Sequence, residues 1–283
     1  DYIGSFSGDE NVEWLGTMLY DANSLVRNSA ARALSEASGN QEYNILQDAL
    51  DDSIRIVRLS AVVGLSELSQ SDIQNHAKNH FTTALREYKQ YLDVSQYFPQ
   101  GQMNRGQFYE RQGVQDKAIE AYETALEKDP SFNPARINLA HIYNEKGDNE
   151  KAKELFQTVI DQDPNNGSAH YSLALLLSEE DNLENAVTHF EKAAQLMQEN
   201  SRVYYNWAIA LQRLKRPEES EHAYLEAIDL APDNVEYRYG ICTLYIQQEQ
   251  YEVALPHAEK LEELRPNNSN IQRVVRLIKY RTN

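Results

Sequence analysis

The sequence predicts an all-α protein built from stacked helical hairpins, and a repeating unit carries that prediction. Between Asn133 and Asn166, two apolar stripes of helical spacing are separated by Gly147 and followed by Asp163-Pro164. This is the pattern of two amphipathic helices of about three turns each, with a glycine turn between them and a proline stop after them. One such pair cannot cover its own apolar stripes, so it must stack on copies of itself.

The copies recur every 34 residues over about 99–268. Four copies end with a proline at the same position (Pro130, Pro164, Pro232 and Pro266), and Gln198 takes that place in the remaining one. Two small sites and one large site also repeat in register. The small sites hold Gly106, Ala140, Ala174, Ala208 and Cys242, then Ala118, Ala152, Ala186, Ser220 and Ala254, and the large site holds Tyr122, Phe156, Phe190 and Tyr224.

This arrangement resembles the tetratricopeptide repeat, in its period, its alternation of small and large residues and its terminal proline. The resemblance implies a right-handed α-solenoid of helical hairpins, with five tetratricopeptide repeats over 99–268. Residues 269–283 are amphipathic, and we expect them to form a C-terminal capping helix that covers the last apolar stripe.

Residues 1–70 contain a shorter period of 31 residues, which places Asp21 on Asp52 and Arg27 on Arg58. Each copy predicts a short helix, an Asp-containing turn and a second helix with small residues on its inner face. The pattern resembles HEAT-like repeats. In that family the turn Asp and the helix Arg form a polar ladder between adjacent repeats, so the resemblance implies this role for the four residues.

Residues 71–98 are predicted to be a joining helix, or half repeat, rather than a flexible linker. Phe81, Leu85 and Tyr88 lie on one apolar face, and no segment rich in Pro, Gly or Ser interrupts residues 41–98. We therefore expect these three side chains to join the HEAT-like and tetratricopeptide parts in one continuous core.

Composition argues against several classes of function. The net charge is −17 and no basic stripe is present, so we expect no nucleic-acid partner. No apolar run approaches the roughly 18 residues that span a bilayer, so we expect no direct membrane insertion. The GxGxxG, GxxxxGK[ST], HExxH, GxSxG and CxxCH motifs are missing, and His76 and His80, spaced i, i+4, suit a solvated helix face. We predict a non-enzyme with no cofactor and no metal site.

One strip of residues remains as a candidate binding site. In tetratricopeptide arrays the first helix of each pair lines the concave surface, and here its repeating positions carry tyrosines and amides. The resemblance is to members whose asparagines hold an extended peptide backbone; the same residues also suit a half-exposed helix face without a ligand. The candidate partner-binding residues are Asn104, Asn138, His141, Tyr171, Tyr205, Asn206 and Tyr239. We expect Tyr205 and Asn206 to face outward, so that their replacement affects binding more than stability.

The predicted function is a non-enzymatic scaffold that binds a protein or extended peptide in the concave groove. Two alternatives stay open. HEAT-like repeats that run into tetratricopeptide repeats through Ala84–Tyr88 resemble the non-haem C-terminal region of bacterial multihaem c-type cytochromes. That implies an accessory region of an electron-transfer protein, a c-type cytochrome partner and a periplasmic or extracellular location. The other alternative is a homo-oligomer, because stacked repeats leave complementary end faces.

Overall fold

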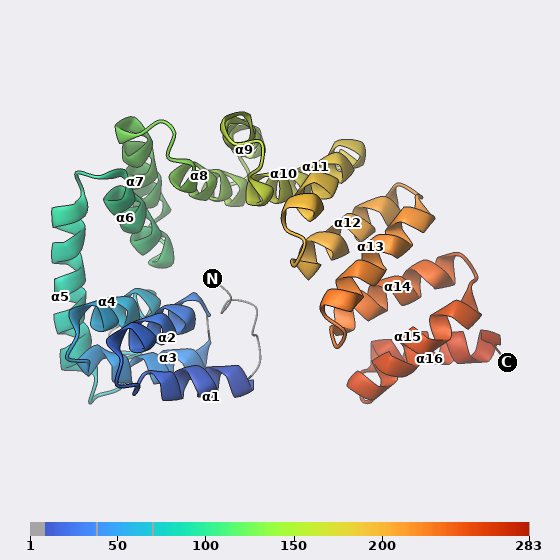
Figure 1. Ribbon diagram of the computed structural model, residues 1–283, viewed down its shortest axis with the longest axis horizontal. Coiled ribbons are helices and arrows are strands. Elements are labelled where there is room, and N and C mark those ends of the chain that lie inside the picture. The colour runs from blue at the N-terminus through green and yellow to red at the C-terminus, as the bar shows by residue number, and fades with distance from the viewer. Residues whose placement is uncertain (1–8, 38, 70, 283) are drawn as a thin grey trace. The chain divides into compact units, whose positions relative to one another are not determined.

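A computed structural model describes residues 9–37, 39–69 and 71–282, and every regular element in these ranges is helical (Figure 1). The prediction of an all-α fold made of helical hairpins is confirmed. The chain divides into two compact units, residues 1–142 (unit 1) and 143–283 (unit 2). This division falls within the predicted tetratricopeptide region, and the predicted domain boundaries stay predictions.

The helices of unit 1 are α1 (Asp9–Met18), α2 (Ser24–Glu36), α3 (Asn40–Leu46), the 3-10 helix η1 (Asp48–Asp51), α4 (Arg55–Gly64), α5 (Lys78–Ser95), α6 (Pro99–Arg111) and α7 (Gln115–Lys128). Helix α8 (Asn133–Glu145) contains the division between the units. The helices of unit 2 are α9 (Asn149–Gln162), α10 (Gly167–Glu179), α11 (Leu183–Leu196), α12 (Ser201–Arg213), α13 (Pro217–Leu230), α14 (Val235–Gln247), α15 (Tyr251–Leu264) and α16 (Ser269–Thr282).

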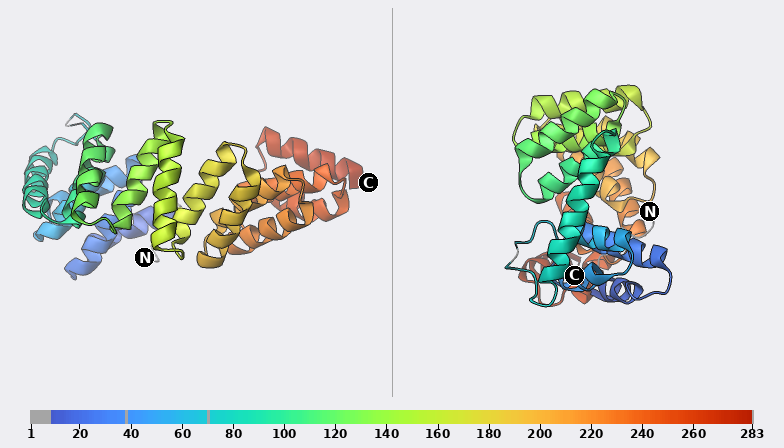
Figure 2. Two further views of the ribbon diagram at one scale, coloured as in Figure 1. Left: turned by 90° about the horizontal axis from the view of Figure 1, so that it is seen from above. Right: turned by 90° about the vertical axis from the view of Figure 1, so that its left-hand side faces the viewer.

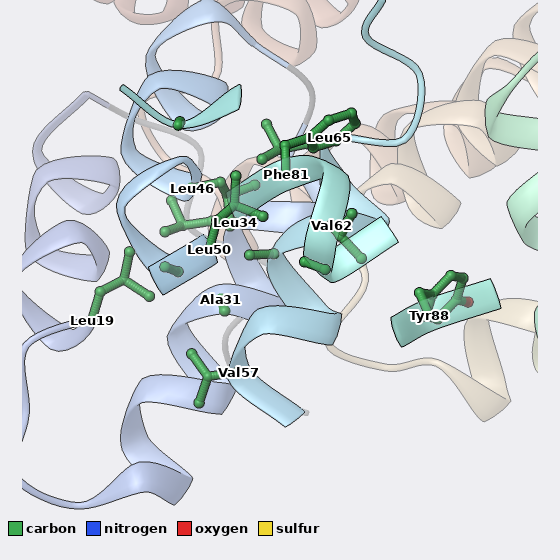
Figure 3. Close-up of a cluster of buried hydrophobic side chains, with 14 of the residues drawn as sticks. Leu19, Ala31, Leu34, Leu46, Leu50, Val57, Val62, Leu65, Phe81 and Tyr88 are labelled. Atoms are coloured by element: carbon green, nitrogen blue, oxygen red, sulfur yellow. The ribbon is translucent and has the colours of Figure 1, made fainter. Parts of the chain in front are cut away.

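A single hydrophobic cluster runs through unit 1 from α1 to α6. Its centre holds Leu34, Leu46 and Leu65, all fully buried, and Phe81 of α5 packs against it (Figure 3). Tyr88 and Phe108 extend the same cluster into α6, with their ring centroids 5.4 Å apart. The predicted continuous core through residues 81–88 is therefore confirmed.

Helix α5 connects the two halves of unit 1. It runs from the layer of α1–α4 to the hairpin of α6 and α7 as one uninterrupted helix (Figure 2). Its buried side chains, Phe81, Ala84, Tyr88 and Leu92, recur at intervals of three and four residues, which places them on one face of the helix. Burial of that face fixes α5 to both of its neighbours, α4 and α6.

A polar ladder connects the two N-terminal hairpins and α5. The Arg27 guanidinium donates to both carboxylate oxygens of Asp52, at 2.6 and 3.1 Å. One hairpin further along, Arg58 donates in the same way to both oxygens of Glu87 in α5. Two parallel bonds of this kind fix orientation as well as distance.

The role expected for Asp21 differs in one respect. Its backbone carbonyl, not its carboxylate, accepts from Arg27, and the carbonyl of Asp52 accepts from Arg58 at the repeated position. The Asp21 carboxylate instead accepts from the backbone N–H of Asn23 and shapes the turn before α2. The HEAT-like identity of this region stays a prediction.

Small residues allow the paired helices to approach closely. In the hairpin of α6 and α7, a Cβ on Gly106 would lie 2.4 Å from the ring of Tyr122, so only glycine fits beside that ring. In the hairpin of α12 and α13, the hydroxyl of fully buried Ser220 donates to the carbonyl of Ala208 at 2.8 Å. That bond explains how a polar residue is tolerated at a site that otherwise holds alanine.

The turn inside each hairpin of the 34-residue period requires a left-handed residue at one repeating position. Gly113 and Gly147 have φ values of 70° and 79°, and Asp181, Lys215 and Glu249 have values of 63°, 59° and 59°. In every turn the following N–H donates to the carbonyl five residues before it, as from Gln250 to Tyr245 at 2.9 Å. This is the Schellman end of a helix, in which glycine avoids the Cβ penalty.

We expect Glu249→Gly to raise the free energy of unfolding of unit 2 by about 0.5–1 kcal/mol, because glycine removes the left-handed strain. The reverse change, Gly147→Ala, should lower it by a similar amount. A Cβ at that position meets nothing within 4 Å, so the effect comes from the backbone alone. Urea melts followed by circular dichroism measure both. Equal midpoints for the parent and the two variants would contradict this account.

We expect Asp52→Asn to destabilise unit 1 by about 1–3 kcal/mol at pH 7, because it removes a charge-assisted pair with Arg27. Bonding to Arg27 holds the pKa of Asp52 below its ordinary value. The stabilisation is therefore present above the unfolded-state pKa of about 3.9 and is lost as the pH falls through the folded-state pKa.

Urea melts at pH 7 and at successively lower pH values test this prediction. The difference between the parent and Asp52→Asn should shrink as the pH falls below about 4. Asp93→Asn is a matched control, because its ion pair with Arg105 is exposed on the aspartate side and contributes little. A difference that does not change with pH would show that Asp52 acts through packing alone.

Candidate functional site

Unit 1 contains a groove of about 790 Å³ between the N-terminal hairpins and the hairpin of α6 and α7. We call it the unit-1 groove. Side chains from α2, α4, α5, α6 and α8 line it, including the predicted residues Asn104 and Asn138 and their neighbour Met103. Its volume lies in the range of sites that hold a ligand or a peptide side chain.

The lining of the unit-1 groove combines an apolar wall with a row of amides. Helix α4 supplies the apolar side chains Ile56, Leu59 and Val63, and α6 and α8 supply amides on the other side. The amide side chains are Gln100, Asn104, Gln107 and Asn138. An amide donates and accepts hydrogen bonds at once, so it matches the N–H and C=O of a peptide backbone without selecting a sequence.

Long-range hydrogen bonds hold the walls of this groove in place. Arg111 of α6 donates to the backbone carbonyl of Ser35 at the end of α2, at 2.9 Å and 76 residues away in sequence. The C-terminus of a helix attracts cations, so this contact stabilises both walls. Asn104 donates to the hydroxyl of Tyr91 at 2.9 Å and accepts from Gln100 at 2.9 Å. The amide of Asn104 is thereby oriented before any ligand binds.

Asn138 is linked to the groove through Tyr122. The Tyr122 hydroxyl donates to Glu110 at 2.6 Å and accepts from Asn138 at 3.4 Å. Burial, followed by the bond to Glu110, raises the pKa of Tyr122 well above its ordinary value, so its proton stays on the hydroxyl. Glu110 itself lines the groove, as do Arg32, Glu36 and Arg111, so both signs of charge are present there.

Sequence reasoning missed the α2 and α4 side of this groove. Arg32 of α2 and Leu59 of α4 lie far in sequence from the amides of α6 and α8, and neither period relates them to those amides. The sequence did contain one signal for this side of the groove. Ile56 is a large apolar residue that falls outside the buried stripe of α4, and in the structure its side chain is 55% exposed.

The predicted tyrosines of unit 2 lie on the first helices α10, α12 and α14, and contacts beside two of them link these helices. Asn206 donates to the Tyr171 hydroxyl at 2.6 Å, which joins α12 to α10. The Tyr205 ring lies 4.7 Å from that of Tyr237, which joins α12 to α14. Burial raises the pKa of both Tyr171 and Tyr205. Tyr239 is 36% exposed.

Tyr205 and Asn206 do not face freely outward as expected, and the smaller effect of their replacement on stability than on binding stays a prediction. Both side chains are half-buried, and the Tyr205 ring also packs 6.0 Å from the buried ring of Tyr224. The Asn206 amide nitrogen carries two hydrogens, and one of them is donated to the Tyr171 hydroxyl. The cause is the stacking of successive hairpins, which brings first helices close enough for side chains at equivalent positions to touch.

His76, His80 and His141 were also considered in the sequence analysis. None of these three side chains lines the unit-1 groove. His141 is exposed on α8, about one turn beyond Asn138. His76 precedes the start of α5 at Lys78, so it does not share that helix with His80. The two instead approach Asp48 at 4.0 Å and Asp51 at 3.0 Å, respectively. In the part of the chain that the structure describes, no three His, Cys, Asp or Glu residues gather as a metal site.

Four tetratricopeptide models match the chain, over residues 77–131, 112–176, 167–200 and 201–234. Residues 77–234 are tetratricopeptide repeats. The first match includes α5, so the helix predicted as a joining half repeat falls within the family. No curated protein sequence matches the chain.

Several solved structures share the fold of this chain. MamA (residue 41 to its end) from Desulfovibrio magneticus RS-1 is 19% identical, with a TM-score of 0.55 over 60% of this chain and 97% of that one. YrrB, described as a TPR protein with an unusual peptide-binding site, is 18% identical, with a TM-score of 0.56 over 68% and 97%. The Pseudomonas aeruginosa pilF protein is 19% identical, with a TM-score of 0.56 over 68% and 87%. At these identities the likeness shows the fold.

Among the described residues, no helix combines the length and apolar composition that crossing a bilayer requires. The resemblance to multihaem cytochromes and the extracytoplasmic location stay predictions.

Proposed function

We propose that this protein is a non-enzymatic scaffold whose unit-1 groove holds an extended segment of another protein. The observation that carries the proposal is that amide side chains held by hydrogen bonds and an apolar wall line the same groove. Asn104 and Asn138 stand on one side of the groove and Leu59 on the other. The amides would bond the ligand's backbone, and the wall would receive alternate side chains.

The tetratricopeptide fold supports this proposal, because helical arrays present long, rigid surfaces suited to binding other polypeptides. A related fold, YrrB, carries a peptide-binding site by its own description. The net charge of −17 favours a partner with Lys or Arg near the bound segment, mainly through the rate of association.

The tyrosine surface of unit 2 is a second part of the proposed binding strip, with Tyr239 as its most exposed ring. It favours contact with apolar side chains, since tyrosine offers a large ring with a polar tip. Tyr171 and Asn206 bond each other and Tyr205 stacks on Tyr237, so Tyr239 offers the most accessible ring of this surface. His141 and Tyr239 stay proposed contacts. A c-type cytochrome and a second copy of the chain stay alternative partners.

The test is a pull-down from the native source followed by titration of the captured partner against variants of the full chain. Asn104→Ala should weaken binding by about 1–3 kcal/mol, because a peptide group on the ligand loses its partner in the groove. Leu59→Ala should weaken it by more than about 1 kcal/mol if the apolar wall is a hot spot. Circular dichroism melts establish that each variant remains folded.

Two further variants locate the site. Asn185→Ala, on the exposed side of α11, is the matched control and should bind as the parent does. Asn206→Ala reports on the tyrosine surface. Unchanged affinity in Asn104→Ala and Leu59→Ala, together with loss in Asn185→Ala, would refute the groove. Loss in Asn206→Ala alone would move the site to unit 2.

A further inference from the structure

The N-terminus of α10 carries a reactive dipeptide that the proposed function does not use. Asn166 and Gly167 form the only Asn-Gly pair in the sequence. In such a pair the backbone nitrogen of the glycine can attack the side-chain amide carbon of the asparagine, because no Cβ stands in the way and the glycine backbone adopts the required conformations readily. The pair is therefore a candidate site at which the chain modifies itself.

The 34-residue period provides two sites for comparison. Asn166, Asn200 and Asn234 occupy the same position in successive repeats, and the side chain of each caps the helix that follows. Ser201 and Val235 follow the other two asparagines, so a side chain hinders the attack there. The repeat of α10 alone among these three combines the capping asparagine with a glycine.

In the folded chain the cap keeps the reacting atoms of Asn166 and Gly167 apart. The Oδ1 of Asn166 accepts from the backbone N–H of Ala169 at 3.0 Å, and its Nδ2 donates to a carboxylate oxygen of Asp163 at 3.4 Å. The ψ angle of Asn166 is 90°, which places the nitrogen of Gly167 nearly trans to the Asn166 Cβ. Ring closure needs these two atoms on the same side of the Cα–C bond, so that bond must first rotate.

The packing of Gly167 opposes the same rotation. Gly167 is buried, and a Cβ there would lie 2.6 Å from the Cγ of Met197 and 3.1 Å from the Cβ of Leu196. The backbone of α10 therefore lies directly against the C-terminal end of α11. Ala169, in the same turn, is fully buried. Rotation at Asn166 thus requires the first turn of α10 to open, with loss of both the cap and this packing.

We propose that Asn166 is a self-modification site that is closed while the first turn of α10 is folded and reacts when that turn opens. The nitrogen of Gly167 bonds to the Cγ of Asn166, the Cγ–Nδ2 bond breaks, and the proton of the Gly167 nitrogen leaves with the ammonia. Water then hydrolyses one of the two bonds between the succinimide nitrogen and its carbonyl carbons. Hydrolysis at Cγ gives aspartate, and hydrolysis at the main-chain carbonyl gives isoaspartate. The net reaction consumes one water and needs no oxidant or reductant.

The two products affect unit 2 differently. Aspartate at a helix N-cap accepts from the Ala169 N–H as asparagine does, and its charge suits the N-terminal end of the helix dipole. Isoaspartate inserts a methylene group into the main chain, so the cap on Ala169 and the contact of Gly167 with Met197 cannot both be kept. A chain that has reacted to isoaspartate therefore keeps an irreversible record that α10 has opened.

The test is incubation of the full chain at neutral pH, folded or unfolded in guanidinium chloride, followed by peptide mapping with mass spectrometry. In the unfolded chain Asn166 should convert at least about tenfold faster than Asn200 and Asn234, because only Asn166 precedes a glycine. In the folded chain its conversion should be at least about tenfold slower than in the unfolded chain, because the first turn of α10 is closed.

Two variants provide matched controls. Ser201→Gly creates an Asn-Gly pair at the equivalent cap of α12, and it should make Asn200 reactive in the unfolded chain and protected in the folded one. Asn166→Ser keeps a capping oxygen without the amide, so it should show no conversion at this position. Circular dichroism melts show that each variant is folded, and Asn166→Asp, which reproduces the aspartate product, should melt as the parent does.

Two outcomes overturn the proposal. Conversion of Asn166 at the same rate in the folded and the unfolded chain would show that the cap and the packing of Gly167 close nothing. Conversion in the unfolded chain no faster than at Asn200 would show that the dipeptide is not a reactive site. Neither result bears on peptide binding in unit 1.

Discussion

Helix α5 has no hairpin partner of its own, and the organisation of unit 1 depends on how its apolar face is buried. An amphipathic helix in water must cover that face, and α5 does so against two different kinds of hairpin at once. Phe81 packs with the N-terminal hairpins, and Tyr88 packs with Phe108 of α6. With 18 residues the helix is about 27 Å long, long enough to carry one hairpin system at each end. The unit-1 groove is lined by both systems and by α5 between them.

Polar contacts then fix the rotation of neighbouring helices, which burial of apolar surface alone does not determine. Apolar packing is not directional, whereas the paired bonds of Arg58 to Glu87 and of Arg27 to Asp52 set the rotation of neighbouring helices. Arg111 connects the far wall of the groove back to α2. The groove therefore has walls of fixed geometry, so little conformational entropy of these walls is lost when a ligand binds there.

The sequence predicted the parts of the fold that are set by local rules. Periods of 31 and 34 residues located the hairpins, and small sites such as Ala174 and Ala208 are fully buried as their register required. The apolar face of α5 also predicted the continuous core. These features follow from helical spacing and residue size, which a single sequence displays.

The candidate site was predictable only in part, because it depends on which helices come together. Asn104 and Asn138 were found from their repeating positions. Leu59 and Arg32 were not, since no pattern relates them to α6. The outward orientation expected of Tyr205 failed for a similar reason. Its ring packs against Tyr224 of its own hairpin and also against Tyr237 in the next hairpin, 32 residues on. Helical periodicity within one hairpin does not display the second contact.

The joining of two hairpin systems by one buried helix is tested most directly by native-state hydrogen exchange across α5. If Phe81 and Tyr88 belong to one core, the amides of α5 open together with those of α2 and α4, with a common free energy and a common dependence on denaturant. The structure predicts that single opening unit. Exchange of the α5 amides at a distinctly lower free energy, while α2 and α4 stay protected, would contradict it and leave the groove without a fixed wall.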